Sequence, residues 1–204
     1  MTIEFNLLKF MLIDDRIVLV SADKAGAGED KSLHSFCHIC EVHIAGDNRL
    51  VQAGAKQFCS SQWDKLKYVS HKVKDNVLTI IQRSQTVEVN SIYQAYGDTN
   101  TIRSYTTVKN ISDSDIVLEY VSAFNMFGLA SVKKSDEIYL YRFTNSHHAE
   151  CQPKRLSFFD LGLFESNCNR TFKRISGFNT GSWSSKEELP QAIIQNTLNG
   201  HFIM

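Results

Sequence analysis

The residues between positions 34 and 43 offer the side chains best suited to binding a transition metal. His34, Cys37, Cys40 and His43 follow one another at intervals of three, and imidazole nitrogen and thiolate sulfur are ligands that zinc prefers. The stretch is predicted to be a strand, in which residues three apart point to opposite faces of the sheet. These four side chains then cannot converge on one ion, and no second ligand pair lies at finger-like spacing. We expect small buried cysteines and edge histidines here, with no metal site and no cofactor.

Other groups that could do chemistry lie further along the chain. Trp63-Asp64 places an aromatic ring that could stack on a sugar beside a carboxylate, but a single such pair is typical of an ordinary loop. His147, His148 and Glu150 could form a polar cluster, although adjacent histidines in loops are usually solvated. None of the five cysteines has a local nucleophile signature, and no glycine-rich phosphate loop or nucleophile elbow occurs. The residues alone therefore predict no catalytic site.

The elements that would position these groups are predicted to be strands. β-Branched and aromatic residues recur in short runs without a helical period. Turn-forming residues at 97–100 and 111–115 connect three of these runs into hairpins. The run 116–126 is apolar on both faces, which predicts a central strand covered on both sides. The strands are expected over residues 16–20, 36–44, 77–83, 87–96, 101–110, 116–126 and 138–143.

Helical signals are sparse. Ser185 and Glu188 form a capping box that predicts a helix of one or two turns, limited by Pro190. Short strands with no long amphipathic helix between them are typical of an antiparallel β-sandwich rather than of alternating strands and helices. We expect one domain over residues 1–204.

Composition narrows the classes of protein further. The 204 residues carry 22 Lys and Arg against 22 Asp and Glu, which argues against a nucleic-acid binder. No apolar run approaches the ~20 residues of a membrane span, and the N-terminus lacks the pattern of a signal peptide. Five cysteines, an odd number, fit reduced thiols better than a disulfide framework. We therefore expect a cytoplasmic protein without a membrane partner.

Four segments carry a resemblance to a known family. They are Leu66-Lys-Tyr-Val-Ser-His71 followed by a strand that ends at Arg83, the hairpin from Val89 to Asn110, the strand from Leu118 to Leu129, and the stretch from Asn179 to Gly200. In this order they are similar to the N-terminal domain of glycoside hydrolase family 36, the bacterial and fungal α-galactosidases. The resemblance implies an antiparallel β-supersandwich of the galactose-mutarotase-like type, incomplete at its C-terminus.

The same resemblance limits the function. Members of the family hydrolyse α-galactosides with retention, and their two catalytic aspartates lie in a (β/α)₈ barrel that follows the sandwich. Trp63-Asp64 does not match the family's Lys-Trp-Asp nucleophile motif, and the barrel is missing from this sequence. No catalytic residue is carried over, and the chain alone is expected to be inactive.

Asp47, Asn48 and Lys56 are the carbohydrate-binding candidates that the resemblance supplies. They keep the frame of a family loop that helps to rim a neighbour's active site, although its acids and histidines are replaced by Leu50-Val-Gln-Ala53. The family's tryptophans at the positions of His147 and Pro153 are also missing, which removes two aromatic platforms. The other interpretation is that Asp47, Asn48 and Lys56 shape a turn.

Three functions stay open at this point. The first is a non-catalytic domain of an α-galactosidase that serves assembly and completes the substrate pocket. The second is a stand-alone carbohydrate-binding or interaction module. The third is an enzyme similar to aldose-1-epimerases, for which no matching histidine and glutamate pair is found. Because a sandwich missing its last strands would expose edges and apolar surface, we expect a homo-oligomer or a barrel-containing partner chain, with an α-galactoside as the possible ligand.

Overall fold

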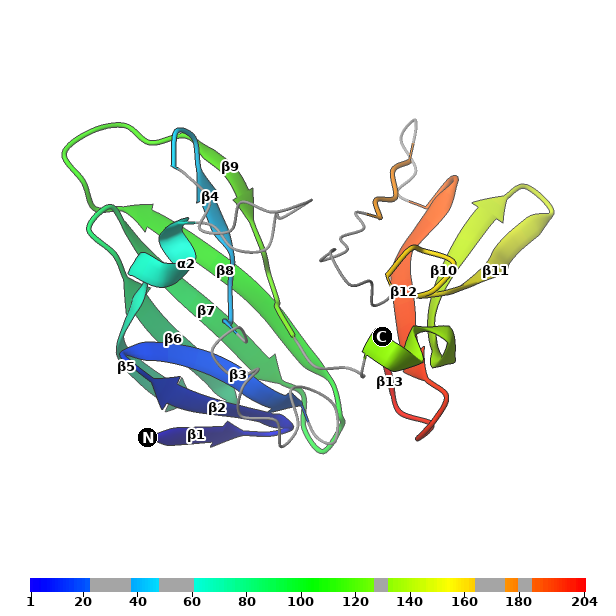
Figure 1. Cartoon of the computed structure of the whole chain (residues 1–204), viewed down its shortest axis with the longest axis horizontal. Coiled ribbons are helices and arrows are strands. Elements are labelled where there is room, and N and C mark those ends of the chain that lie inside the picture. Colours follow the sequence, from blue (N-terminus) through cyan, green and yellow to red (C-terminus); the bar gives the residue numbers. More distant parts are fainter. Residues whose placement is uncertain (23–37, 48–60, 127–131, 164–174, 180–184) are drawn as a thin grey trace. The chain divides into compact units, whose positions relative to one another are not determined.

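The computed structural model describes residues 1–22, 38–47, 61–126, 132–163, 175–179 and 185–204 (Figure 1). The protein is all-β, and its named strand pairs are antiparallel, as predicted. The chain divides into two compact units. Unit 1 comprises Met1–Gln52 and Lys56–Leu129, and unit 2 comprises Ala53–Ala55 and Ala130–Met204. The galactose-mutarotase-like type and the single domain over 1–204 stay predictions.

Unit 1 contains three sheets. The first has the order β1-β2-β3, the second β5-β6-β7-β8, and the third pairs β4 with β9. One short helix, α2 (Ser61–Lys65), lies near β4. The strands are β1 (Thr2–Phe5), β2 (Leu8–Ile13), β3 (Arg16–Ala22), β4 (Val42–Ile44), β5 (Lys67–Lys74), β6 (Val77–Arg83), β7 (Val87–Ala95), β8 (Ile102–Asn110) and β9 (Leu118–Val121).

The core of unit 1 forms where these sheets face one another. Alternate residues of β6 and β7 are buried, as expected for strands with one face in a core. The Phe10 ring of β2 meets the Tyr93 ring of β7 at a centroid distance of 5.2 Å, and both side chains are completely buried. One hydrophobic cluster draws residues from all three sheets, so that burial of apolar surface unites them.

Tight turns set the register of the hairpins. Asp14 and Asp15 connect β2 to β3, and Asp75 and Asn76 connect β5 to β6, all with positive φ. Two consecutive residues with positive φ define the type I′ turn, whose twist matches the twist of the flanking strands. Asp and Asn tolerate this conformation better than other non-glycine residues, which explains why these residues occupy the turns.

Unit 2 is built on one four-stranded sheet with the order β11-β10-β12-β13. Its elements are the 3₁₀-helix η1 (Val132–Glu137) and the strands β10 (Ile138–Ser146), β11 (Ala149–Ser157), β12 (Glu188–Asn196) and β13 (Phe202–Ile203). Central β10 pairs with β11 on one side and with β12 on the other. In the part of the chain that the structure describes, neither helix is long and apolar enough to cross a membrane.

Several expected strands are confirmed. The runs at 16–20, 77–83, 87–96, 101–110 and 138–143 correspond to β3, β6, β7, β8 and β10, and the hairpin predicted at the turn 97–100 forms between β7 and β8. The strand expected over 36–44 is only partly present, because β4 covers Val42–Ile44 and His38 makes an isolated bridge to Val18. Residues 36 and 37 lie outside the described residues.

Three expectations are wrong. The hairpin expected at the turn 111–115 does not form, because β9 pairs with β4 and not with β8. The run 116–126 does not form a central strand, because β9 covers only Leu118–Val121, pairs with β4 alone, and exposes three of its four residues. The strand buried on both faces is β3, whose Ile17 and Leu19 join the main core while Val18 and Val20 form a second cluster. The capping box at Ser185 begins no helix, because Glu188 is already the first residue of β12 and pairs with Thr144 of β10. Strand pairing there overrides the local helical signal.

Candidate functional site

The buried carboxylate of Glu41 is the centre of a small polar cluster in unit 1. Glu41 Oε2 lies 2.5 Å from Nε2 of His38, and Glu41 Oε1 lies 3.2 Å from Nε2 of His43. Glu41 is 2% exposed, His38 5% and His43 8%. The backbone N–H of Glu41 also donates to Ser122 Oγ at 2.7 Å. A buried charge is expensive unless it is paired and hydrogen-bonded, and two imidazoles supply that pairing.

Aromatic side chains enclose this cluster. The His38 ring meets the edge of the Trp63 ring at 5.4 Å, and the His43 ring lies 5.2 Å from the ring of Tyr120. The guanidinium of Arg16 lies 4.8 Å from the centre of the Trp63 ring and also pairs with Asp64. Trp63 and Asp64 therefore serve packing. The Trp63 ring contacts His38 and Arg16, and the carboxylate of Asp64 pairs with Arg16.

The cluster combines a glutamate with two histidines, and these are the residue types that an epimerase uses as base and acid. Sequence reasoning missed it. Its residues are Glu41 with His38 and His43, which are close in sequence and were read as positions along one strand. A general base must reach the proton that it removes. Because Glu41 is almost fully buried and both carboxylate oxygens face imidazoles, this arrangement stabilises the fold and offers no surface to a sugar.

Asp47 is the one predicted carbohydrate-binding residue that the structure describes. Its carboxylate accepts a hydrogen bond from Gln62 Nε2 at 2.5 Å and lies 3.7 Å from Nζ of Lys65. Both partners belong to α2, so Asp47 attaches this helix to the end of β4. Asn48 and Lys56 lie outside the described residues, and the role of all three in sugar binding stays a prediction.

Cys40 and His43, two members of the zinc-like spacing for which no metal site was expected, contact different partners. Cys40 Sγ lies 3.6 Å from Gln82 Oε1 in the core, whereas His43 turns to Glu41. His34 and Cys37 lie outside the described residues. Among the described residues, no group of three histidine, cysteine or acidic side chains could hold a metal ion.

Burial controls the chemistry of Cys40. Desolvation, together with a smaller contribution from the nearby carboxylate of Glu41, raises the pKa of the Cys40 thiol to about 12. Burial also raises the pKa of the neighbouring Tyr93 hydroxyl. Both groups therefore stay neutral at physiological pH, which suits the interior of a core and excludes Cys40 as a thiolate nucleophile.

An exposed pair on β5 falls inside the Leu66–His71 motif. The Tyr68 hydroxyl and His71 Nδ1 are 2.6 Å apart, because a bulge between Tyr68 and Ser70 turns the two side chains to the same side. Partial burial raises the pKa of Tyr68, so that the hydroxyl keeps its proton. His147, His148 and Glu150 lie at a solvent-facing turn, as expected for adjacent loop histidines, and Glu150 accepts a hydrogen bond from the backbone N–H of His148.

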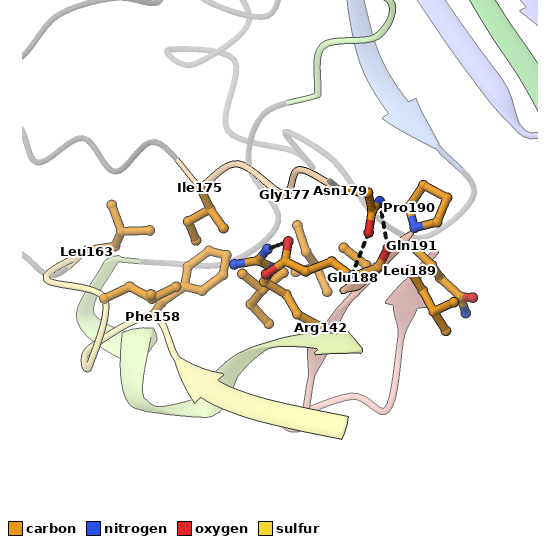
Figure 2. Close-up of a pocket in the computed structure, with 14 residues that line it drawn as sticks. Arg142, Phe158, Leu163, Ile175, Gly177, Asn179, Glu188, Leu189, Pro190 and Gln191 are labelled. Atoms are coloured by element: carbon orange, nitrogen blue, oxygen red, sulfur yellow. Dashed lines mark hydrogen bonds and ion pairs between the residues drawn. The ribbon is translucent and has the colours of Figure 1, made fainter. Parts of the chain in front are cut away.

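Unit 2 contains a pocket of about 540 Å³ on one face of its sheet (Figure 2). Leu140 of β10 and Ile194 of β12 form part of its lining, since they are paired residues that point to the same face. Other apolar lining comes from the residues after β11 and from Ile175. The lining residues are Leu140, Arg142, Phe158, Leu161, Leu163, Ile175, Gly177, Asn179, Glu188, Leu189, Pro190, Gln191, Ala192 and Ile194.

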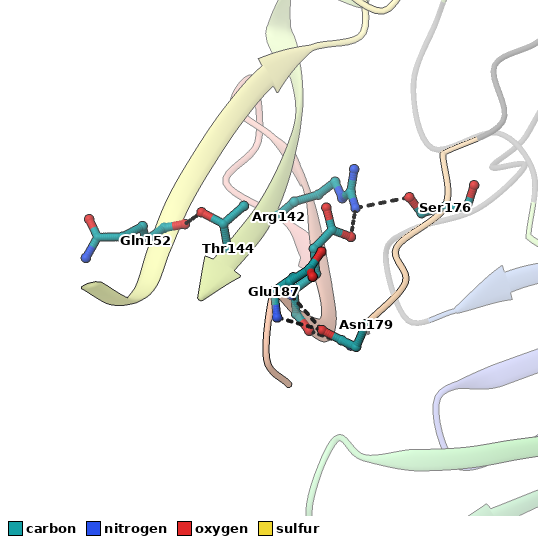
Figure 3. Close-up of polar contacts among 7 residues, drawn as sticks. Arg142, Thr144, Gln152, Ser176, Asn179 and Glu187 are labelled. Carbon is teal, nitrogen blue, oxygen red and sulfur yellow. Dashed lines mark hydrogen bonds and ion pairs between the residues drawn. The ribbon is translucent and has the colours of Figure 1, made fainter. Parts of the chain in front are cut away.

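Polar groups hold one wall of this pocket together (Figure 3). Arg142 pairs with Glu188 and donates to the carbonyl of Ser176 at 3.3 Å. Asn179 Oδ1 accepts from the backbone N–H groups of Glu187 and Glu188, and its amide donates to the carbonyl of Glu188. The side chain of Asn179 thus hydrogen-bonds to the backbone at the start of β12, as a neighbouring strand would.

Gly177 lets the backbone approach this ion pair closely. A Cβ atom there would clash with the Glu188 carboxylate and would lie only 3.3 Å from Nη2 of Arg142. The capping-box pattern at Ser185 predicted a helix, whereas Glu188 lies in a strand and lines the pocket. Sequence analysis therefore gave no sign of the pocket. The pocket combines an apolar lining with a satisfied ion pair, so it offers shape rather than a free charge.

Comparison of the chain with protein-family models, with curated proteins and with solved structures finds no match. The resemblance to α-galactosidases therefore stays a prediction from the four sequence segments.

Replacement of Glu41 tests the buried cluster. Glu41→Gln removes a carboxylate from between two imidazoles and is expected to cost about 3 kcal/mol of unfolding free energy, measured by urea denaturation. Glu4→Gln is the matched control, because Glu4 forms a solvent-exposed pair with Lys9 that contributes about 0–1 kcal/mol. Equal costs for the two variants would contradict a stabilising role for the cluster.

Thiol labelling tests the effect of burial on Cys40. At pH 8 we expect iodoacetamide to modify the exposed Cys151 and to leave Cys40 unmodified, with peptide mass spectrometry as the measurement. Because an ordinary thiol ionises near pH 9 and the folded Cys40 near pH 12, the stability that Cys40 contributes is full below pH 9 and falls as the pH rises toward 12. Rapid labelling of Cys40 in the folded protein would show that the site is open.

Asn179 is expected to hold the start of β12. Asn179→Ala removes three hydrogen bonds to the backbone and is expected to destabilise unit 2 by about 1–3 kcal/mol. Hydrogen exchange at the amides of Glu187 and Glu188 measures the effect locally, with Asn199→Ala, which loses a single bond, as the control. Unchanged protection of both amides would contradict this role.

Proposed function

We propose that the chain is a non-catalytic β-sandwich domain of the α-galactosidase type, which serves assembly and completes a substrate pocket when a barrel is present. The observation that carries this proposal is the collinear order of the four sequence segments and their correspondence to regular structure. Residues 66–71 lead into β5, and the strand that follows is β6, which ends at Arg83. The second segment covers most of the β7–β8 hairpin.

The remaining two segments agree with the same assignment. The third contains β9, which pairs with β4 directly after the Glu41 cluster. The fourth begins at Asn179 and contains β12, and Asn179 is hydrogen-bonded to the first residue of that strand. These segments form strands or hydrogen-bond to them, which supports a shared fold more strongly than sequence similarity alone would.

The state of the carboxylates supports a role without catalysis. A retaining glycosidase needs two carboxyl groups roughly 5 Å apart, one as nucleophile and one as acid/base. Glu41 is enclosed by imidazoles, Asp47 is held by Gln62 and Lys65, and Glu188 is paired with Arg142. Each of these groups is engaged in holding the fold, so the proposal places the hydrolytic step in a partner chain.

The proposal includes assembly and a reducing compartment. Apolar side chains of Val117, Leu118, Tyr120 and Phe124 are exposed along and beside β9, which is consistent with a homo-oligomer or a barrel-containing partner. Cys40 and Cys151 are free thiols, as expected in the cytoplasm. An α-galactoside is the ligand that such an assembly would bind.

Two measurements on the purified full chain test this function. Melibiose hydrolysis is expected to be undetectable, and light scattering after size exclusion is expected to give a mass above the 23.2 kDa of one chain. Real turnover would contradict the non-catalytic assignment. A clean monomer that also fails to associate with, or complement, a barrel-only α-galactosidase fragment would contradict the role in assembly.

A further inference from the structure

The face of the unit 2 sheet opposite the pocket carries a row of aromatic rings. Tyr139, Tyr141 and Phe143 alternate along β10 with the pocket residues Leu140 and Arg142, so they point to the other face. The three rings lie on the central strand of the sheet and are half-buried. Such a row is unusual at a surface, because large aromatic rings are normally buried in a core or at an interface.

Strand pairing brings further side chains to the same face. Arg155 of β11 lies opposite Tyr141, and Gln195 of β12 lies opposite Tyr139. Phe202 of β13 pairs with Gln195 and is 66% exposed. The aromatic face, defined as Tyr139, Tyr141, Phe143, Arg155, Gln195 and Phe202, therefore spans all four strands.

Contacts within the aromatic face fix its side chains. The guanidinium of Arg155 lies 3.5 Å from the centre of the Tyr139 ring and 5.9 Å from that of Tyr141. The Tyr141 hydroxyl donates to Gln195 Oε1 at 2.9 Å. Side chains held in place before binding lose less conformational entropy when a ligand arrives, which favours binding.

The chemistry of the aromatic face matches a neutral oligosaccharide. Flat rings stack on the C–H faces of sugar rings, and planar guanidinium and amide groups can hydrogen-bond to sugar hydroxyls. Arg155 is the one charged side chain of the aromatic face, and it already stacks on Tyr139. Nucleic acid also stacks on aromatic rings but requires several cations for its phosphates, so an almost neutral face favours an uncharged ligand.

We propose that the aromatic face of unit 2 is a glycan-binding surface on which the rings of Tyr141 and Phe202 stack with the pyranose rings of a neutral oligosaccharide, while Arg155, held on the Tyr139 ring, offers its guanidinium to sugar hydroxyls. This goes beyond the proposed function, because the face belongs to neither the Asp47 region nor the pocket. It gives the chain a means of holding a polysaccharide without any catalytic group.

Affinity electrophoresis of the full chain in native gels that contain soluble galactomannan tests the proposal. The wild-type protein is expected to be retarded by the polysaccharide. Phe202→Ala should lower the association constant about tenfold, the scale of one lost stacking contact. Tyr141→Phe keeps the ring and loses the bond to Gln195, so it should reduce binding by about threefold at most.

Phe159→Ala is the matched control, because Phe159 is an exposed aromatic residue of unit 2 outside the aromatic face. It is expected to bind like the wild type, and circular dichroism checks that each variant is folded. Absence of retardation, or equal losses for Phe159→Ala and Phe202→Ala, would overturn the proposal.

Two further outcomes would assign the aromatic face to another partner. Retardation by polyuridylate but not by galactomannan, lost in Phe202→Ala, would make it a nucleic-acid surface. A dimer that Phe202→Ala converts to monomer, without any effect of galactomannan, would make it a contact between copies of the chain. Hydrolysis and light scattering test the proposed function independently, so either idea can fail without the other.

Discussion

The pairing of Glu41 with two imidazoles is the interaction on which the arrangement of unit 1 depends. Glu41 belongs to the segment 38–44, which contacts all three sheets: His38 bridges to β3, Cys40 contacts Gln82 of β6, and Val42 pairs with β9. A carboxylate buried without partners would cost more than the whole domain's typical stability. The segment can therefore take only the path that brings His38 and His43 to the carboxylate, and this path determines where the sheets meet.

The two units differ in how they treat their polar groups. In unit 1, ionisable side chains near the core are either paired, as Glu41 is, or kept neutral by burial, as Cys40 is. In unit 2, one face of the sheet forms a pocket and the other presents half-buried rings. A sealed core is suited to stability, whereas concave or aromatic surfaces are suited to recognition. This difference agrees with the proposal that unit 2 is the part of the chain that binds a ligand.

Sequence patterns predicted β6, β7 and β8 of the second sheet because these strands carry runs of β-branched and aromatic residues, whereas β5 was not among the expected strands. They failed where pairing or side-chain contacts decide the structure. β1 and β2 were missed although Asp14-Asp15 is a type I′ turn signal, and β12 was obscured by a capping box that strand pairing with Thr144 overrides. In a continuous strand, side chains alternate between the two faces, so His38 would point away from Glu41 and His43, and the pattern gave no sign of the Glu41 cluster. The chain leaves the strand conformation between positions 39 and 41, and this allows the three side chains to meet. Asp47 was identified, but its contacts with α2 depend on a helix that no pattern indicated.

The carboxylates of the two units lead to one conclusion about function. Catalytic acids and nucleophiles require a carboxylate whose environment leaves it available to a substrate, and such environments reduce stability. Three carboxylates instead form ion pairs within their own unit: Glu41 with His38, Asp47 with Lys65, and Glu188 with Arg142. Recognition by stacking makes no such demand, since an aromatic ring such as that of Tyr141 or Phe202 can stack on a ligand without any free charge. The proposed role in holding a ligand, rather than in transforming it, agrees with a fold in which these acids are engaged and the aromatic rings are half-buried.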